Sequence, residues 1–298
     1  MKHTKIPIPV YDLDMINRKQ LHGDVVAEAL PDFLKVYKEL KAPHRFSFYY
    51  ILLITRGGGA KTIDFEQFDI HPGQIYFTIP GQVHSWNLDS KTEGFVVSFS
   101  EKIFRSFISN PFYLEQFPFL RGIPKSSVID LQKEHLKDAV LIIRSIVNEV
   151  KKKDTFSLDQ VCLLLMSLFI NISRHHALAV KKLIPEQTQN TLFNFRRLIN
   201  EYYLYKRLPK DYSALLYVTP NHLNALCRDY LGKSAGQLIR DRIILEAKRL
   251  LVNADINISE IAYRLNFKDN SYFTKFFKKS VGLTPEEFRK YSIENSRR

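Results

Sequence analysis

The sequence of 298 residues predicts a two-domain α+β protein, in which a small β-barrel and a helical segment are followed by an all-α domain. Three observations predict this fold class. Short runs of β-branched and aromatic residues, separated by glycine- and proline-containing turns, fill residues 45–99. Apolar residues recur at spacings of three and four through residues 136–172. A pattern of two helices joined by a tight turn then occurs twice, and a long helix separates its two copies.

The strands predicted for the first domain, residues 1–105, rest on three runs: Phe46–Thr55, Gln74–Ile79 and Gly94–Phe99. Turn signals accompany them: Gly57-Gly58-Gly59, Pro72-Gly73 and Pro80-Gly81. Short strands at such spacing are typical of a small barrel or sandwich. The glycine triplet lacks the Lys-Ser/Thr pair and the following helix of a phosphate-binding loop, so we expect it to form a hairpin turn.

Two amphipathic helices are predicted in the next segment, residues 106–180. The first apolar stripe consists of Leu136, Ala139, Val140, Ile143, Ile146, Val147 and Val150, and the second of Leu158, Val161, Cys162, Leu165, Leu168, Phe169 and Ile172. Leu163, Leu164 and Ile170 lie outside the second stripe, so this helix must be covered on more than one face. Packing on the barrel and a subunit interface both remain open, and both can hold. A polar linker is predicted at residues 181–191, around Pro185.

The last domain, residues 192–291, contains an internal repeat. Laying residues 213–240 over 262–290 pairs Ser213 with Ala262, Leu216 with Leu265, Val218 with Phe267, Leu223 with Phe273, Cys227 with Phe277, Gly232 with Gly282 and Leu238 with Phe288. The repeat predicts two helix-turn-helix motifs, at about 210–231 and about 258–281.

The second helix of each motif has its own start and stop signals. Thr219 and Asp269 are placed to cap the two helices, and Pro220 suits the first helical position. Gly232 and Gly282 follow the helices where a left-handed residue ends them. We therefore expect matching helices in the two copies.

One face of each second helix is apolar, through Leu223, Leu226 and Cys227 in the first and Phe273, Phe276 and Phe277 in the second. The opposite faces are polar: Asn221, Asn224 and Arg228 in the first, and Asn270, Ser271, Thr274, Lys275 and Lys278 in the second. Amides at a helix start can bind adenine in the major groove, and a lysine can reach guanine. Such faces are also ordinary on surface helices, but the duplication, the caps and the positive charge favour DNA recognition.

Between the copies, Ala235–Asn253 is predicted as one helix with Ile243, Ala247, Leu250, Leu251 and Ala254 on one side. Its length of about 28 Å is close to one turn of B-DNA at ~34 Å, so the two motifs can enter successive major grooves. Arg242 and Glu246, four residues apart, are expected to brace this helix.

The net charge of +13 is concentrated in the same region. Residues 187–298 carry 20 Lys and Arg against 11 Asp and Glu, whereas residues 1–186 carry 24 against 20. Positive charge of this kind supplies the salt-dependent, sequence-independent part of DNA affinity.

A family resemblance follows from the second motif. The segments Ile258–Ala262, Asn266–Phe273, Phe276–Lys279, Gly282–Pro285 and Phe288-Arg289 resemble the signature of the AraC/XylS family of bacterial transcription regulators, over about 100 residues from Phe193 to Tyr291. The resemblance implies base-contacting side chains at Asn221, Asn224 and Ala225, and at Asn270, Ser271 and Lys275. The sequence departs from the family at Asn266, where Gly is usual, and at Ser213, where Ala is common. Ala225 can at most touch a thymine methyl.

The segment from Pro72-Gly73 through Pro80–Trp86 resembles the cupin-like sensor half of the same family. The resemblance implies a small-molecule effector of unknown identity, a homodimer, and activation of transcription with RNA polymerase as a further candidate partner.

Metal-binding cupins use a His-x-His pair, a Glu and a further His. Here His84 follows the turn, but His44 has no second His beside it. We therefore expect no metal, no cofactor and no catalysis, and we expect His84 and His71 to be satisfied by backbone groups near turns.

The remaining features predict a cytoplasmic protein that does not enter a membrane. The longest apolar run, Val161–Ile170, is too short for a span, and Met1–Val10 has no hydrophobic segment. Cys162 and Cys227 are expected in the core of a protein from a reducing compartment.

These observations predict a transcription factor that binds double-stranded promoter DNA and senses an effector. Two alternatives stay open: a cupin-type metal enzyme tethered to DNA, and a constitutive DNA-binding protein whose barrel only dimerises.

Overall fold

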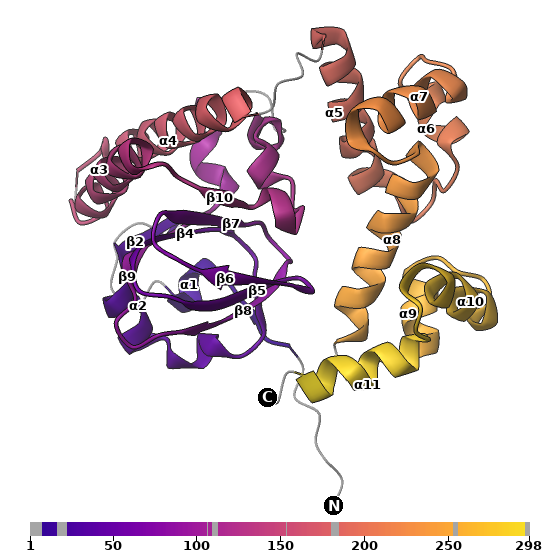
Figure 1. Cartoon of the computed structure of the whole chain (residues 1–298), viewed down its shortest axis with the longest axis horizontal. Coiled ribbons are helices and arrows are strands. Elements are labelled where there is room, and N and C mark those ends of the chain that lie inside the picture. Colours follow the sequence, from indigo (N-terminus) through magenta and orange to yellow (C-terminus); the bar gives the residue numbers. More distant parts are fainter. Residues whose placement is uncertain are drawn as a thin grey trace, which may run out of the picture. The chain divides into compact units, whose positions relative to one another are not determined.

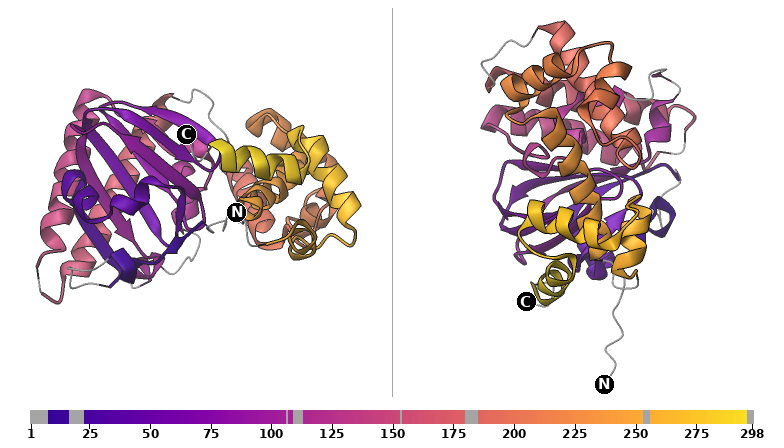
Figure 2. Two further views of the ribbon diagram at one scale, coloured as in Figure 1. Left: turned by 90° about the horizontal axis from the view of Figure 1, so that it is seen from below. Right: turned by 90° about the vertical axis from the view of Figure 1, so that its right-hand side faces the viewer.

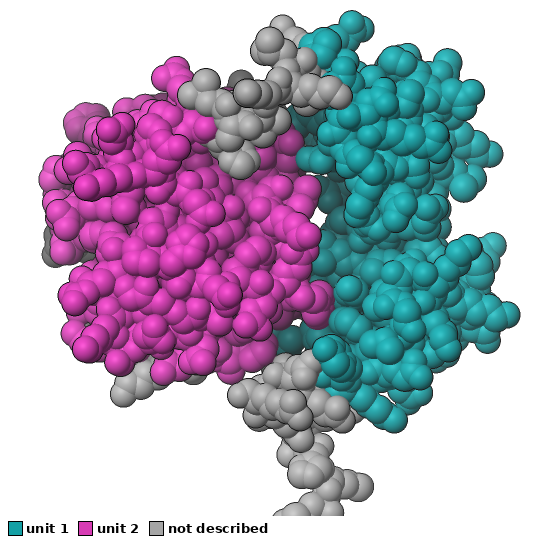
Figure 3. Space-filling model, in the orientation of Figure 1, with its two compact units in different colours: residues 1–8, 182–298 teal, residues 9–181 magenta. Residues whose placement is uncertain are grey.

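The computed structural model describes residues 8–16, 23–105, 107–108, 113–152, 154–179, 185–252 and 256–295. The chain divides into two compact units, one formed by Pro9–Lys181 and the other mainly by Lys182–Arg298 (Figure 3).

The N-terminal unit contains two five-stranded sheets that face each other (Figure 1). The first sheet, in the order β1-β3-β8-β5-β6, consists of Val10–Tyr11, His44–Phe46, Val83–Leu88, Gly59–Ile63 and Glu66–Ile70. The second, in the order β10-β7-β4-β9-β2, consists of Val128–Asp130, Gln74–Thr78, Tyr49–Arg56, Glu93–Phe99 and Val25–Ala29. This arrangement confirms the β-rich N-terminal fold that the short strands predicted.

The glycine triplet does not form the predicted hairpin turn. β4, which precedes it, pairs with β7 and β9, whereas β5, which follows it, pairs with β6 and β8. The triplet therefore carries the chain from one sheet to the other. Position 59 requires glycine, because its φ is 130° and a Cβ there would lie 2.3 Å from the carbonyl oxygen of Asn87.

Short helices connect these strands and two long helices follow them. The short ones are α1 (Leu13–Ile16), α2 (Leu30–Val36) and the 3₁₀ turns Lys38–Lys41, Glu101–Phe104, Tyr113–Gln116, Pro118–Leu120 and Pro124–Ser126. The long ones are α3 (Lys133–Glu149) and α4 (Ser157–Ala179), which cover the outer face of the second sheet (Figures 1 and 2).

The apolar stripe of α4 lies inside this unit. Leu165 and Phe169 are fully buried, and the stripe packs in one core with Ile51, Phe77 and Val97 of the second sheet. By length and composition alone, α4 could cross a membrane between Ser157 and His175, but its stripe serves as core. The stripe cannot be a subunit interface, because the sheet already covers it. This corrects that alternative for the stripe itself, whereas Leu163 on another face of α4 is 53% exposed.

The C-terminal unit is helical. Its helices are α5 (Glu186–Tyr202), α6 (Pro209–Leu215), α7 (Pro220–Leu231), α8 (Ala235–Leu251), α9 (Ile258–Arg264), α10 (Asn270–Val281) and α11 (Pro285–Asn295). α8 runs from the α6–α7 pair to the α9–α10 pair (Figure 1). Residues 186–191, expected in the linker, belong to α5, and residues 181–184 of the predicted linker lie outside the described residues. Asn253 and Ala254, expected at the end of the long helix, also lie outside them.

Candidate nucleic-acid interface

The two helix-turn-helix motifs have the same backbone turn. The amide of Val218 donates to the carbonyl oxygen of Ser213 at 3.0 Å, and the amide of Phe267 donates to that of Ala262 at 2.9 Å. The residue before each donating amide has a left-handed backbone conformation: Tyr217 has a φ of 55° and Asn266 a φ of 56°. The turn therefore survives without the glycine that is usual in the family, and the repeat alignment is confirmed at its turn.

The helix caps also match. The Thr219 hydroxyl accepts from the amide of His222 at 3.1 Å, and the Asp269 carboxylate accepts from the amides of Ser271 and Tyr272 at 2.9 and 3.2 Å. Gly232 and Gly282 end the two helices with φ values of 67° and 85°. These predicted start and stop signals are confirmed.

The apolar faces of α7 and α10 pack into the hydrophobic core of the C-terminal unit. Leu223, Leu226 and Cys227 are buried in α7, and Phe273 and Phe277 in α10, while Phe276 is half-buried. Cys162 and Cys227 are buried free thiols, as expected for core residues. Most of the predicted DNA-contacting side chains are consequently exposed: Asn221, Ala225, Arg228, Asn270, Ser271, Lys275 and Lys278. Asn224 and Thr274 are half-buried.

The side chain of Asn224 joins α7 to the start of α8. Its amide nitrogen donates to the carbonyl oxygen of Pro220 at 3.1 Å, and its amide oxygen accepts from the backbone amide of Ala235 at 3.1 Å. A bidentate contact to adenine uses the same two atoms. In this structure the amide nitrogen and the amide oxygen of Asn224 both bond to groups of the protein itself, whereas a base-contacting residue would have them free to reach DNA.

α8 is braced as predicted. The Arg242 guanidinium lies 3.0 Å from the Glu246 carboxylate, which also lies 3.7 Å from Arg249. Arg242 donates in addition to the side-chain oxygen of Asn200 on α5 at 3.0 Å. With 17 residues, α8 is about 26 Å long.

A second connection between the motifs involves Arg207, which the sequence did not single out. Its guanidinium donates to the carbonyl oxygens of Leu265 and Asn266 and lies 4.0 Å from the ring centroid of Phe267. Sequence patterns give no signal for this contact, because the partners are 58 and 59 residues away.

The sequence did not single out two further exposed side chains beside the predicted contacts. His222 lies next to Asn221 at the start of α7, and Tyr272 lies next to Ser271 at the start of α10. The first turn of a recognition helix contacts base edges, and this position alone could have marked both residues.

In the N-terminal unit the two candidate metal ligands lie opposite each other. His44 on β3 pairs in register with His84 on β8, and their ring centroids are 4.2 Å apart. His44 contacts the carbonyl oxygen of Ala42 through Nδ1 at 2.8 Å, but neither ring nitrogen of His84 has a hydrogen-bond partner among the described residues. The expectation that backbone groups satisfy His84 is therefore wrong, because His84 belongs to β8 and its buried ring packs against the side chains of His44, Tyr50 and Trp86 instead of a turn.

His71 differs from both. It lies at the surface, where Nδ1 is 3.4 Å from the carbonyl oxygen of Pro72 and Nε2 is 3.4 Å from the Asp130 carboxylate.

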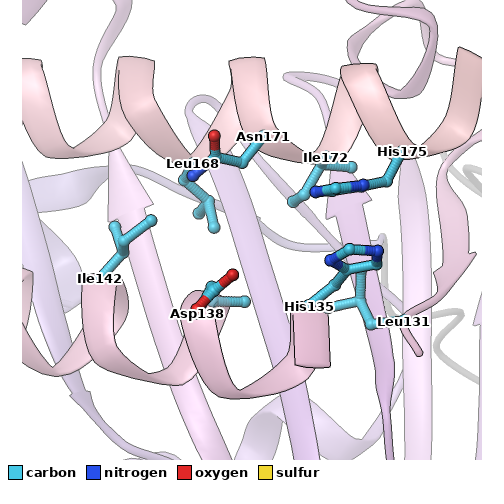
Figure 4. A pocket seen from close by; sticks show the side chains of 9 residues that line it. Leu131, His135, Asp138, Ile142, Leu168, Asn171, Ile172 and His175 are labelled. Atoms are coloured by element: carbon cyan, nitrogen blue, oxygen red, sulfur yellow. The ribbon is translucent and has the colours of Figure 1, made fainter. Parts of the chain in front are cut away.

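A second histidine pair lies in a recess between α3 and α4. The rings of His135 and His175 stack with centroids 3.2 Å apart, beside Asp138 and Asn171 (Figure 4). Within the described ranges, no group of three or more His, Cys, Asp or Glu side chains is arranged to hold a metal ion.

Comparisons with known proteins match both units. A family model of a helix-turn-helix domain matches residues 212–291, and a model of an AraC-like ligand binding domain matches residues 37–166. The HTH-type transcriptional activator RhaR of Yersinia pestis bv. Antiqua (strain Angola) is 23% identical over 262 residues, covering 87% of this chain and 88% of that protein. RhaR of Cronobacter sakazakii is 23% identical over 274 residues, covering 89% and 90%.

Among solved structures, unsaturated fatty acid bound ToxT from Vibrio cholerae strain SCE256 is 12% identical with a TM-score of 0.44, covering 91% of this chain and 96% of that chain.

Proposed function

This chain belongs to the AraC/XylS family of transcription regulators and is a sequence-specific DNA-binding transcription factor, and we propose that it activates transcription in response to a small-molecule effector. In this proposal α7 and α10 enter successive major grooves of promoter DNA. The observation that carries it is the repeated pair of capped helices, each of which buries its apolar face and exposes polar side chains from its first turn.

We assign base contacts to exposed residues in the first two turns of each helix: Asn221 and Ala225 of α7, and Asn270, Ser271 and Lys275 of α10. We assign phosphate contacts to the half-buried Thr274 and to Arg228 and Lys278, which lie about one turn further along the helices. Asn224 takes a different role in the proposal. Because both ends of its amide are bonded within the protein, we assign it to positioning α7 against α8 rather than to base recognition.

The direction of regulation and the partners extend the proposal. The RhaR relatives are named activators, so we propose activation, with RNA polymerase as a partner in the cytoplasm. We propose a homodimer that uses the outer faces of α3 and α4. Leu141 and Leu163 are 62% and 53% exposed there, whereas the inner stripes are covered.

The test is DNA binding by the full-length protein as a function of salt. We expect Kd to rise steeply with salt concentration, because phosphate contacts release counterions. Lys278→Ala should weaken binding to all sequences and reduce the slope of log Kd against log salt by about one. Lys91→Ala, which removes an exposed lysine of the N-terminal unit, is the matched control and should leave the slope unchanged. A folded wild-type protein without DNA affinity at low salt would contradict the proposal.

A further inference from the structure

Seven polar side chains meet between the two sheets of the N-terminal unit. We call them the interior cluster: His44, Lys61, His84 and Trp86 from the first sheet, and Tyr50, Thr78 and Ser98 from the second. Strand register explains their meeting. His44 lies opposite His84 and Lys61 lies opposite Trp86. Tyr50 lies opposite both Thr78 and Ser98.

All seven side chains are almost completely buried, yet most of their polar atoms are unpaired. Among the described residues no hydrogen-bond partner exists for these atoms: Nε2 of His44, Oη of Tyr50, Nζ of Lys61, Oγ1 of Thr78, both ring nitrogens of His84, Nε1 of Trp86 and Oγ of Ser98. Buried polar groups in folded proteins are almost always hydrogen-bonded. So many buried polar atoms without partners in one place are typical of a binding site in which a polar ligand supplies the missing hydrogen bonds.

Lys61 is the cation of this cluster. Its ammonium lies 5.5 Å from the ring centroid of Tyr50 and 5.0 Å from that of Trp86. The two ring planes are within 12° of parallel and their centroids are 6.0 Å apart. The aromatic faces offer the ammonium a cation–π interaction but no hydrogen-bond acceptor.

The electrostatics of the cluster favour an incoming anion. Burial lowers the pKa of Lys61 to about 7, and no carboxylate contributes to raising it. Burial also lowers the pKa of His44 to about 4 and that of His84 well below its usual value, so both imidazoles are neutral. Lys61 is thus the one group of the cluster that can carry charge near neutral pH, and a single negative charge would balance it.

We propose that the interior cluster is the effector site and that the effector is a small organic monocarboxylate, bound with its carboxylate on Lys61. This inference rests on the proposed effector-dependent function. Trp86 Nε1 and the Tyr50 hydroxyl are the neighbouring donors for the second carboxylate oxygen. The surrounding Phe33, Phe46 and Leu52 are apolar and suit a hydrophobic body. A neutral polyol could accept hydrogen bonds from the ammonium but would leave its charge uncompensated, which distinguishes the two classes of ligand.

The test uses acids and their neutral amides as ligands for the full-length protein. Thermal shift and titration calorimetry at pH 6.5 would compare benzoate with benzamide and hexanoate with hexanamide, with inorganic phosphate as a further anion. We expect the carboxylates to raise Tm and to bind at least tenfold more tightly than the amides. Equal binding of acid and amide, binding of phosphate alone, or no carboxylate binding would each overturn the proposal.

Two variants assign the effect to the cluster. Lys61→Met keeps an unbranched side chain of nearly the same length without its charge and should abolish the preference for acid over amide. Lys91→Met is its surface control and should keep that preference. Tyr50→Phe keeps the ring and should weaken carboxylate binding several-fold. A folded Lys61→Met protein that binds carboxylates as tightly as wild type would overturn the assignment.

DNA binding in the absence of carboxylates separates this inference from the proposed function. Intact DNA binding by wild type and Lys61→Met, together with no carboxylate response, would refute only the effector class. Loss of DNA binding by the wild type would refute the proposed function itself.

Discussion

Arg207 and Asn266 connect the two helix-turn-helix motifs directly. Arg207 donates to the carbonyl oxygen of Asn266 at 3.0 Å, and the Asn266 side chain donates to the carbonyl oxygen of Leu204 at 3.0 Å. The turn of the second motif is therefore attached to the segment that precedes the first. Because of this contact, the spacing of α7 and α10 does not depend on α8 alone.

We expect Arg207→Ala to loosen that spacing. The variant leaves the carbonyl oxygen of the buried Leu265 and the face of Phe267 without a partner, and also exposes the carbonyl oxygen of Asn266 to water. The loss at Leu265 and Phe267 should cost about 1–3 kcal/mol of stability. It should also tolerate one inserted base pair between the two half-sites better than the wild type does. Competition binding with selected operators of altered spacing measures the effect. Arg264→Ala, which removes an exposed arginine of α9, is the control. Equal spacing tolerance in Arg207→Ala and the wild type would contradict the role of Arg207.

Tyr217 stores backbone strain at the turn of the first motif. It has a φ of 55° and is 96% exposed, so its ring contributes little packing. A left-handed conformation costs an L-residue about 1–2 kcal/mol, and glycine avoids this cost. Glycine also gives the unfolded chain more backbone entropy, which offsets part of the gain. We expect Tyr217→Gly to raise the free energy of unfolding by roughly 0.5–1 kcal/mol. Urea denaturation measures it, and Tyr217→Ala, which keeps a Cβ, should show no such gain.

The two faces of α4 predict opposite mutant behaviour. Leu165→Lys puts a charge into the core against the second sheet and should destabilise the N-terminal unit by about 4 kcal/mol or more. Leu163→Lys changes an exposed residue and should leave the fold intact while reducing dimerisation. Circular dichroism and sedimentation together distinguish the two. A folded Leu163→Lys protein that dimerises like the wild type would place the interface elsewhere.

The buried ammonium of Lys61 should make stability depend on pH. Its pKa is about 7 in the folded protein and about 10.5 when exposed, so the unfolded chain binds more protons between these values. The wild type should therefore gain stability relative to Lys61→Met as pH rises above 7, by up to about 1.4 kcal/mol per pH unit. His44 and His84 are neutral throughout this window, and burial raises the pKa of Tyr50, so these neighbours do not titrate in it. Chemical denaturation from pH 7 to 9.5 measures the difference, and a constant difference would contradict this account.

Local signals made the second half of the chain predictable. A cap such as Thr219 or Asp269 and a stop such as Gly232 act within one turn of the helix, so the sequence alone reveals them. Pairing between distant strands leaves no such signal. The glycine triplet lacks the features of a phosphate-binding loop and was therefore expected to form a hairpin turn, yet the strands on its two sides, β4 and β5, belong to different sheets.

For the same reason, the sequence alone did not reveal the roles of several residues in the DNA-binding unit and in the interior cluster. Lys61 faces the barrel interior only because β5 pairs with β8 in a register that puts Lys61 beside Trp86. Arg207 contacts a turn 58 residues away, and Asn224 bonds to the start of the next helix. In each case the residue type is ordinary, and its role depends on a tertiary contact that no periodicity encodes.

The central claim, recognition of promoter DNA by two helices, is tested most directly by selecting binding sites from random DNA with the full-length protein. The account predicts two half-sites about 10–10.5 base pairs apart, centre to centre. Asn221→Ala should relax base preference in one half-site and Asn270→Ala in the other, each by about 1–3 kcal/mol of discrimination. A single motif whose base preferences neither substitution changes would contradict it.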